Sequence, residues 1–238
     1  MKKVLFFLCV MFFLSSAGQV SAETIQLMIG TETNTQAYRI CTNIAAALSD
    51  KMGTPIELVY RPHKRMYHEL MEGRNFQGVF IGKDGFEKEG PHLIKIPQPV
   101  VSSPFFAFAT SDTIKINGWK SLADYKVIYK SGIKFIEENL EKNRILSTYP
   151  IDSRINGIKF LLAGRADVFV DAPLLMLQVL ETSEFKDKGI VMLKPAVDES
   201  LFYTYFDNKY ADIAKKYAKA LDELTADGTR ERIIKETK

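Results

Sequence analysis

The chain has 238 residues with 32 basic and 29 acidic side chains, and 46% of the residues are hydrophobic. This apolar content is enough to build true cores, and the length fits one large domain or two small lobes. The nearly even charge balance argues against nucleic acid or an anionic membrane surface as the partner.

The N-terminus has the pattern of a cleaved export signal. Lys2 and Lys3 precede an apolar run of about 11 residues, and Val20 and Ala22 suit the last positions before a signal-peptidase cut. A membrane anchor is the weaker alternative, because a spanning helix needs roughly 20 apolar residues. We therefore predict a signal peptide over 1–22. Its removal leaves 216 of the 238 residues, with 30 basic and 29 acidic side chains and a net charge of +1, in the periplasm.

The cysteine content limits the chemistry of the mature chain. Only Cys41 remains after removal of the signal, so no intramolecular disulfide can form, even in an oxidising compartment. Cys41 lies in an apolar helical pattern, and we expect a small buried hydrophobe rather than a nucleophile.

The first part of the mature chain alternates between strand and helix patterns. We predict strands at 23–29, 56–60 and 78–81, separated by helices at 36–51 and 63–71. This alternation within about 60 residues is typical of βαβ units and a parallel sheet.

A second series of strands and helices follows a loop predicted at 82–90, and a buried strand predicted at 105–110 leaves the first series. The second series is expected to begin with a helix at 119–125, a strand at 126–129 and helices at 131–142 and 153–162. A strand at 166–170, a helix at 173–180 and a strand at 190–193 come next. A strand at 201–206 then returns to the first series, and the chain ends with helices at 209–224 and after 228.

One helix of the second series has a defined start and a predicted apolar face. Asp152 or Ser153 should cap its N-terminus. Helical spacing then places Ile155, Ile158 and Leu162 on one face.

The two series predict two α/β lobes joined by two crossing segments. The first lobe is expected to comprise 23–107 plus 200–238, and the second 108–199. One continuous doubly wound sheet is the structural alternative.

Several short motifs occur in a characteristic order along the mature chain. They are the strand at 25–30, the helix from Arg65 to Gly73, Trp-Lys-Ser-Leu at 119–122, Tyr-Lys-Ser-Gly at 129–132, the Gly-Arg-Ala-Asp segment at 161–171 and the closing Leu-Asp-Glu-Leu-Thr-Ala-Asp-Gly at 221–228. In this order they resemble family 3 of the bacterial extracellular solute-binding proteins. The resemblance implies a two-lobed (type II) periplasmic binding protein fold and a role in presenting a small polar solute, such as an amino acid, to an ABC permease.

One segment departs from the family pattern. Amino-acid-binding members carry an arginine, which pairs with the ligand carboxylate, before the exit from the first lobe. The corresponding segment here, 83–90, contains two lysines and three acids but no arginine. This difference argues against a standard α-amino acid as the ligand.

Four candidate binding residues follow strands of the first lobe, because ligands of open α/β sheets bind beyond the carboxyl ends of the strands. Glu32 follows the first strand, and Tyr38 comes a turn later. Arg61 follows the second strand, and Arg65 lies on the next helix. A guanidinium group matches carboxylate or phosphate, so these arginines suit an anion or zwitterion. The alternatives are a solvated basic face for the arginines and a plain loop carboxylate for Glu32.

Three candidates lie in the second lobe. Ser131 and Gly132 are predicted at a helix N-terminus, where free N–H groups favour an anionic group. Asp171 follows a strand, and the family resemblance implies that its carboxylate binds the amino group of the ligand. Its alternative role is to cap the following helix.

Aromatic side chains are concentrated on the two predicted crossing segments. We expect most of them to be core and one or two to line the cleft between the lobes. They are Phe105, Phe106, Phe108, Phe202, Tyr203 and Tyr205.

The sequence lacks the common catalytic motifs. H-E-x-x-H, paired-cysteine spacing, a P-loop and G-x-S-x-G are all absent. We therefore predict a monomeric binding protein rather than an enzyme, with no cofactor and no metal. Two alternatives stay open: a sensory protein acting on a membrane receptor, and a lyase or dehydratase on the same scaffold.

Overall fold

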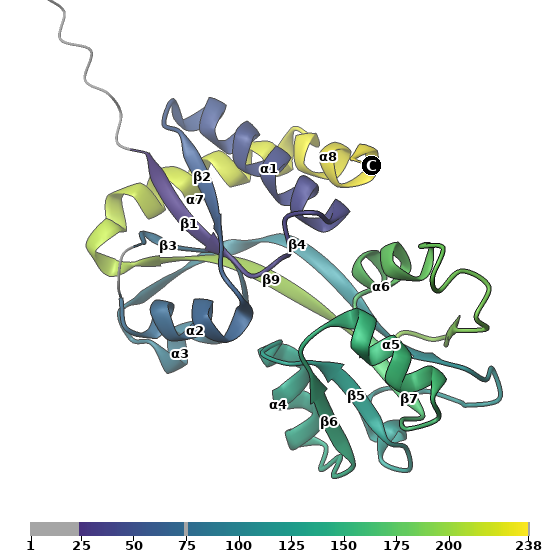
Figure 1. Cartoon of the computed structure of the whole chain (residues 1–238). Helices are drawn as coiled ribbons and strands as arrows, with labels where there is room; N and C mark the ends of the chain where they lie inside the picture. The colour runs from purple at the N-terminus through teal and green to yellow at the C-terminus, as the bar shows by residue number, and fades with distance from the viewer. Residues whose placement is uncertain (1–23, 74–75, 238) are drawn as a thin grey trace, which may run out of the picture.

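The computed structural model describes residues 24–73 and 76–237 (Figure 1). The signal peptide predicted at 1–22 lies outside the described residues. Within those two ranges, no helix is both long enough and apolar enough to cross a bilayer.

The first series of strands and helices forms as predicted. β1 (Ile25–Ile29) pairs in parallel with β2 (Ile56–Tyr60) on one side and with β3 (Gly78–Lys83) on the other. α1 (Gln36–Met52) and α2 (His63–Met71) connect them. Because the strands are parallel, the residues that follow β1 and β2 lie at the same edge of the sheet.

The ends and the buried face of α1 follow from its sequence. The side chain of Thr35 accepts a hydrogen bond from the Tyr38 N–H at 3.1 Å, and the helix ends at Gly53, whose φ of 63° is left-handed. Cys41 is buried against the sheet, and burial raises the pKa of its thiol to about 12. The thiol is therefore protonated near neutral pH, in agreement with the predicted role as a small hydrophobe.

Two long antiparallel strands connect the lobes. β4 (Leu93–Ala109) and β9 (Asp198–Asp207) pair with each other along most of their length. β9 also pairs with β3 in the first lobe, and β4 pairs with β7 (Val168–Asp171) in the second. These are the predicted crossing segments, and Figure 1 shows them running from one lobe into the other.

β4 is longer than the sequence indicates. Prolines interrupt its pattern, but the register with β9 shifts on both sides of Pro99, and such irregularities accommodate residues that cannot donate to the ladder. The predicted strand at 105–110 is therefore only the last part of a 17-residue strand. The loop predicted at 82–90 is also partly wrong, because it contains the short helix α3 (Phe86–Glu89).

The second lobe repeats the parallel arrangement. β5 (Val127–Lys130) lies between β7 and β6 (Thr148–Ile151) and is parallel to both. β6 was not predicted, because Pro150 interrupts a four-residue strand at the edge of the sheet. The remaining elements of this lobe are η1 (Trp119–Leu122), α4 (Lys134–Lys142), α5 (Arg154–Leu162), α6 (Pro173–Leu180) and β8 (Val191–Met192).

Two predictions about the helices of this lobe are wrong in detail. α4 begins at Lys134 rather than at Ser131, because Gly132 has a left-handed φ of 85° that cannot continue a helix. The face predicted for α5 is also rotated: Ile155 and Leu162 are exposed, and Ile158 is buried. The buried face of α5 includes Gly157, where a Cβ would lie 2.1 Å from Ile151 Cδ1.

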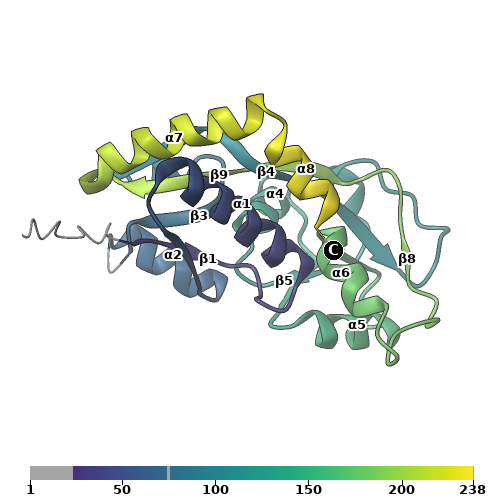
Figure 2. The ribbon, with the colours of Figure 1, turned by 90° about the horizontal axis from the view of Figure 1, so that it is seen from above.

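The C-terminal part of the chain packs on the first lobe. η2 (Asn208–Tyr210) leads into α7 (Ala211–Ala226), and α8 (Thr229–Glu236) follows after Gly228. Figure 2 shows α7 and α8 beside α1 on one side of the first lobe. The chain thus crosses to the second lobe and returns, as predicted.

Each lobe has its own hydrophobic core. In the first lobe, α1 and α7 cover one face of the strands, and α2 and α3 cover the other. In the second lobe, η1 and α4 pack on one face, and α5 and α6 on the other. The hydrogen-bonded path β2-β1-β3-β9-β4-β7-β5-β6 is continuous only because β4 and β9 run through both lobes. The two-lobed fold is confirmed, and the lobe boundaries at 107 and 200 stay predictions because each falls inside an unbroken strand.

Candidate functional site

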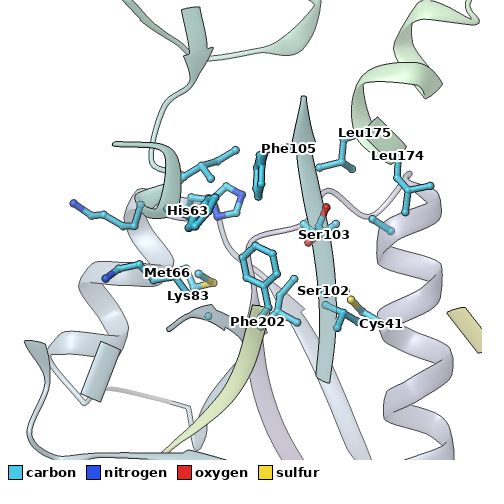
Figure 3. Close-up of a pocket in the computed structure, with 18 of the residues that line it drawn as sticks. Cys41, His63, Met66, Lys83, Ser102, Ser103, Phe105, Leu174, Leu175 and Phe202 are labelled. Atoms are coloured by element: carbon cyan, nitrogen blue, oxygen red, sulfur yellow. The ribbon is translucent and has the colours of Figure 1, made fainter. Parts of the chain in front are cut away.

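A cavity of about 160 Å³ lies between the lobes, beside the crossing strands (Figure 3). Both lobes contribute to its walls, and most of the lining side chains are apolar or aromatic. These are Ala37, Ile40, Cys41, Met66, Tyr67, Ile81, Phe86, Val101, Phe105, Ile133, Phe135, Leu174, Leu175, Phe202 and Ile234.

Three of the aromatic residues in the wall are phenylalanines that lie close together. Phe105 and Phe202 come from β4 and β9, and Phe135 comes from α4. The ring centroid of Phe105 lies 5.0 Å from that of Phe135 and 6.4 Å from that of Phe202. Two of the six aromatic residues of the crossing segments therefore reach the cavity. Others, such as Phe108, are fully buried in the core, as predicted.

His63, the first residue of α2, lines this cavity and a second, more polar one of about 240 Å³. Its ring lies against Gly30, where a Cβ would be only 2.3 Å from Nδ1. Burial, together with the nearby cations Arg154 and Lys130, lowers the pKa of His63 to about 4. The imidazole is therefore neutral near pH 7 and has one donor and one acceptor nitrogen.

An ion-pair network joins the lobes beside His63. Arg154 Nε and Nη2 donate to the two carboxylate oxygens of Asp171 at 2.6 and 3.2 Å, and Nη1 donates to Glu32 at 3.2 Å. Lys130 Nζ lies 3.1 Å from the other oxygen of Glu32. Burial alone would raise the pKa of Glu32, but Arg154 and Lys130 lower it overall. Glu32 belongs to the first lobe and its partners to the second, so the network bridges the cleft.

A second bridge between the lobes is centred on Lys83. Its ammonium group lies 2.7 Å from Glu89 of its own lobe and 2.8 Å from Glu138 of the second lobe. Close by, Lys134 Nζ lies 4.7 Å from the ring centroid of Tyr67, across the same cleft. Two sets of charged contacts therefore cross the cleft, Glu32 with Arg154 and Lys130, and Lys83 with Glu138.

Known proteins with this arrangement were found mainly by structure. No family model matches the chain. An uncharacterized protein of Shewanella oneidensis is 28% identical over 155 residues, a match that spans 62% of this chain and 56% of that relative. The chain therefore matches only about half of the length of the curated relative.

Two solved structures have the same architecture at low sequence identity. A histidine kinase sensor domain with similarity to periplasmic binding proteins superposes with a TM-score of 0.74 at 16% identity, covering 91% of this chain and 96% of that one. The substrate-binding protein of an amino acid ABC transporter superposes with a TM-score of 0.66 at 14% identity, covering 90% and 99%. The fold is that of the two-lobed periplasmic binding proteins.

Within this binding-protein fold, four predicted site residues lie at the cleft between the lobes. Asp171 and Glu32 are brought together by Arg154. Gly132 lines the apolar cavity, and Ser131 lines the second cavity. The free N–H groups expected at a helix N-terminus do not occur here. The Gly132 N–H donates to Glu137 Oε1 at 2.8 Å, and the Ser131 N–H donates to a strand carbonyl oxygen at 2.9 Å.

The other three predicted residues do not line either cavity. Arg61 and Arg65 both bind the carboxylate of Glu69, at 3.3 and 2.5 Å, and two-thirds of the Arg65 side chain is exposed. Tyr38 donates its hydroxyl to the Leu58 carbonyl oxygen at 3.4 Å and packs against the core of the first lobe. The structure therefore favours the alternative interpretation of the two arginines, as part of a solvated basic face.

Sequence reasoning missed Arg154, His63 and Lys83. The strand-end rule that selected Arg61 also applies to His63 two residues later, so this residue could have been found. Arg154 has no comparable signal, because an arginine at the first turn of a helix is ordinarily solvated. Among the described residues, no group of three His, Cys, Asp or Glu side chains could hold a metal ion.

Proposed function

We propose that this chain is an exported, non-enzymatic binding protein whose two lobes close on a small molecule in the periplasm. The observation that carries the proposal is the cavity at the junction of the lobes, whose walls come from both of them. A ligand there would contact both lobes only in the closed form, so its binding would shift the population toward closure.

The ion pairs between the lobes support a closure mechanism. Glu32 binds Arg154 and Lys130 across the cleft, and Lys83 binds Glu138. All these contacts break when the lobes separate, and they need no bound molecule to form. They would lower the cost of closing, so that a small ligand can decide the equilibrium with modest binding energy.

The membrane partner of the closed form is most simply an ABC permease, which is the type of system that one structural relative serves. The alternative is a receptor in a sensory pathway, because another structural relative is the sensor domain of a histidine kinase. Both uses need the same closure, and a neighbouring permease gene or sensor gene would distinguish them.

A lyase or dehydratase is the less favoured alternative. The charged groups at the cavity are paired with one another, and His63, with a pKa of about 4, is a weak base near neutral pH. Among the described residues that line the cavity, the charged groups are therefore paired and the imidazole is a weak base, which disfavours a strong general base.

The experiment is a ligand screen on residues 23–238 with two readouts. Thermal unfolding should shift upward for at least one compound, by about 2.7 kcal/mol in stability at a hundredfold excess over Kd. Small-angle scattering should report a smaller radius of gyration with the same compound. A compound that stabilises the protein and is chemically altered would favour the enzyme. A broad library of amino acids, organic acids, polyamines and small aromatic compounds without any shift would contradict the proposal.

A further inference from the structure

The charged residues that could recognise an amino acid are already occupied by the protein itself. Both carboxylate oxygens of Asp171 bind Arg154, and one of them also accepts from the Ala172 N–H at 2.8 Å. Asp171 is fully buried and Arg154 nearly so. Both oxygens of the Asp171 carboxylate are therefore already bonded within the protein rather than open to an ammonium group of a ligand. Glu32 is likewise held by two cations.

The remaining space is suited to an apolar molecule. The cavity of about 160 Å³ is close in size to the engineered protein cavity of about 150 Å³ that binds benzene. The rings of Phe105, Phe135 and Phe202 form one wall, and Met66 and Leu175 contribute aliphatic surface. Tilted ring pairs at these distances provide edges and faces that a further ring can pack against.

The wall of this cavity also contains polar side chains, among them Thr31, Ser102, Ser103 and His63. No hydrogen bond joins the His63 ring nitrogens to any residue of the described ranges, and the ring lines the cavity together with Phe105 (Figure 3). A neutral imidazole can donate one hydrogen bond and accept another. It matches a hydroxyl or amide group better than an ammonium group, because Arg154 and Lys130 already place positive charge nearby.

We propose that this cavity, as the site of the binding role proposed above, takes a small aromatic molecule with one uncharged hydrogen-bonding group and no ammonium group. The aromatic body packs against Phe105, Phe135 and Phe202, and the polar group bonds to His63. The Arg154–Asp171 pair excludes primary amines and α-amino acids by filling the site that would bind them.

The test uses three probes that share a phenyl ring: benzyl alcohol, benzylamine and L-phenylalanine. Isothermal titration calorimetry on residues 23–238 should detect binding of benzyl alcohol, with affinity at least tenfold higher than that of either amine. Benzylamine or L-phenylalanine binding as tightly as benzyl alcohol would overturn the inference.

Two variants connect the binding to this cavity. His63→Leu should weaken benzyl alcohol roughly tenfold, the value of about one hydrogen bond. The matched control His68→Leu, on the exposed side of the same helix, should leave the affinity unchanged. Ser103→Phe, which adds a ring from the same face of β4 as Phe105, should abolish binding while the circular dichroism spectrum stays native. Unchanged affinity in both cavity variants would place the probe elsewhere and contradict the inference.

Different outcomes test the aromatic ligand class and the binding role. If a charged solute or an amino acid binds and reduces the radius of gyration, the binding role stands and the aromatic ligand class is wrong. If no compound of a broad library binds, both are wrong.

Discussion

The two halves of the cleft between the lobes differ in how their side chains are satisfied. In the ionic half, Glu32, Arg154, Asp171 and Lys130 bind one another, and no charge is left without a partner. In the apolar half, most of the lining side chains are hydrophobic, and the ring nitrogens of His63 have no hydrogen bond to a described residue. Charged residues at strand ends can therefore bind one another across a cleft instead of presenting free charges. Here they join the two lobes, and the apolar cavity lies beside them.

The largest effect should come from breaking the buried ion pair. Asp171→Ala leaves the Arg154 guanidinium buried with only Glu32, and we expect a loss of about 3–5 kcal/mol in the free energy of unfolding. Urea denaturation measures it. Asp167→Ala, which removes one exposed hydrogen bond to the Lys126 N–H, is the matched control and should cost about 1 kcal/mol. The double substitution Arg154→Met, Asp171→Leu removes both buried charges and should recover most of the lost stability. If it does not, the pair stabilises the protein beyond neutralising its own charges.

The pH dependence should be the next largest effect. Because His63 has a pKa of about 4 when folded and an ordinary value of 6.5, its contribution to stability is complete above pH 6.5 and is lost as the pH falls toward 4. The loss should approach about 3 kcal/mol. Denaturation of wild type and of His63→Leu between pH 7 and pH 4 separates the contribution of His63 from that of Glu32. The lowered pKa of Glu32 also makes the stability fall as the pH falls. Parallel curves for the two proteins would mean that His63 titrates normally.

A smaller effect should follow from adding a Cβ at the contact between the lobes. In Gly132→Ala the new Cβ would lie 3.0 Å from His63 Cβ and from Lys64 Cγ, in addition to the strain of a left-handed φ. Gly164→Ala has the same strain but no atom within 4 Å, so it is the matched control. Both should lose about 1–2 kcal/mol from the strain. Only Gly132→Ala should also increase the radius of gyration measured by small-angle scattering. Equal radii for the two variants would argue that this glycine does not limit closure.

The smallest effect should come from the second bridge between the lobes. Glu138→Gln removes one of the two carboxylates on Lys83, and Glu138 is half exposed, so the cost in stability should be less than about 1 kcal/mol. The radius of gyration should rise slightly at low salt and less at high salt, because screening already weakens the pair. Glu141→Gln on the solvent face of the same helix is the control. A loss in stability larger than that of Asp171→Ala would mean that the Lys83–Glu138 pair stabilises the protein more than the Arg154–Asp171 pair does.

Most of the fold was predictable because it depends on local patterns. The strands and helices of the first lobe, the start of α6 at Pro173 and the start of α5 after the Ser153 cap all follow from periodicity, proline placement and capping. The missed or shifted elements are those where a local signal opposes the tertiary arrangement. β6 contains a proline, α3 is a single turn, and Gly132 delays α4.

The pairing of charged side chains at the cleft is less predictable from the sequence, for a physical reason. The strand-end rule selects positions, but it does not say which charge will find a partner inside the protein. The family resemblance predicts that Asp171 binds a ligand's amino group, whereas its carboxylate is bound by Arg154, 17 residues earlier in the chain. The sequence predicts that Arg61 and Arg65 bind an anion, whereas both bind Glu69 in the structure.

The amino-acid sequence by itself determined the order of the strands and helices, the return of the chain to the first lobe, and the enrichment of the crossing strands in aromatic residues. Periodicity and turn residues act over a few positions, so they can be read along the chain. Only the tertiary structure decided which charges neutralise each other, that His63 stays neutral, and that an apolar cavity remains between the lobes. These outcomes depend on distances and burial between residues far apart in sequence, such as Glu32 and Arg154.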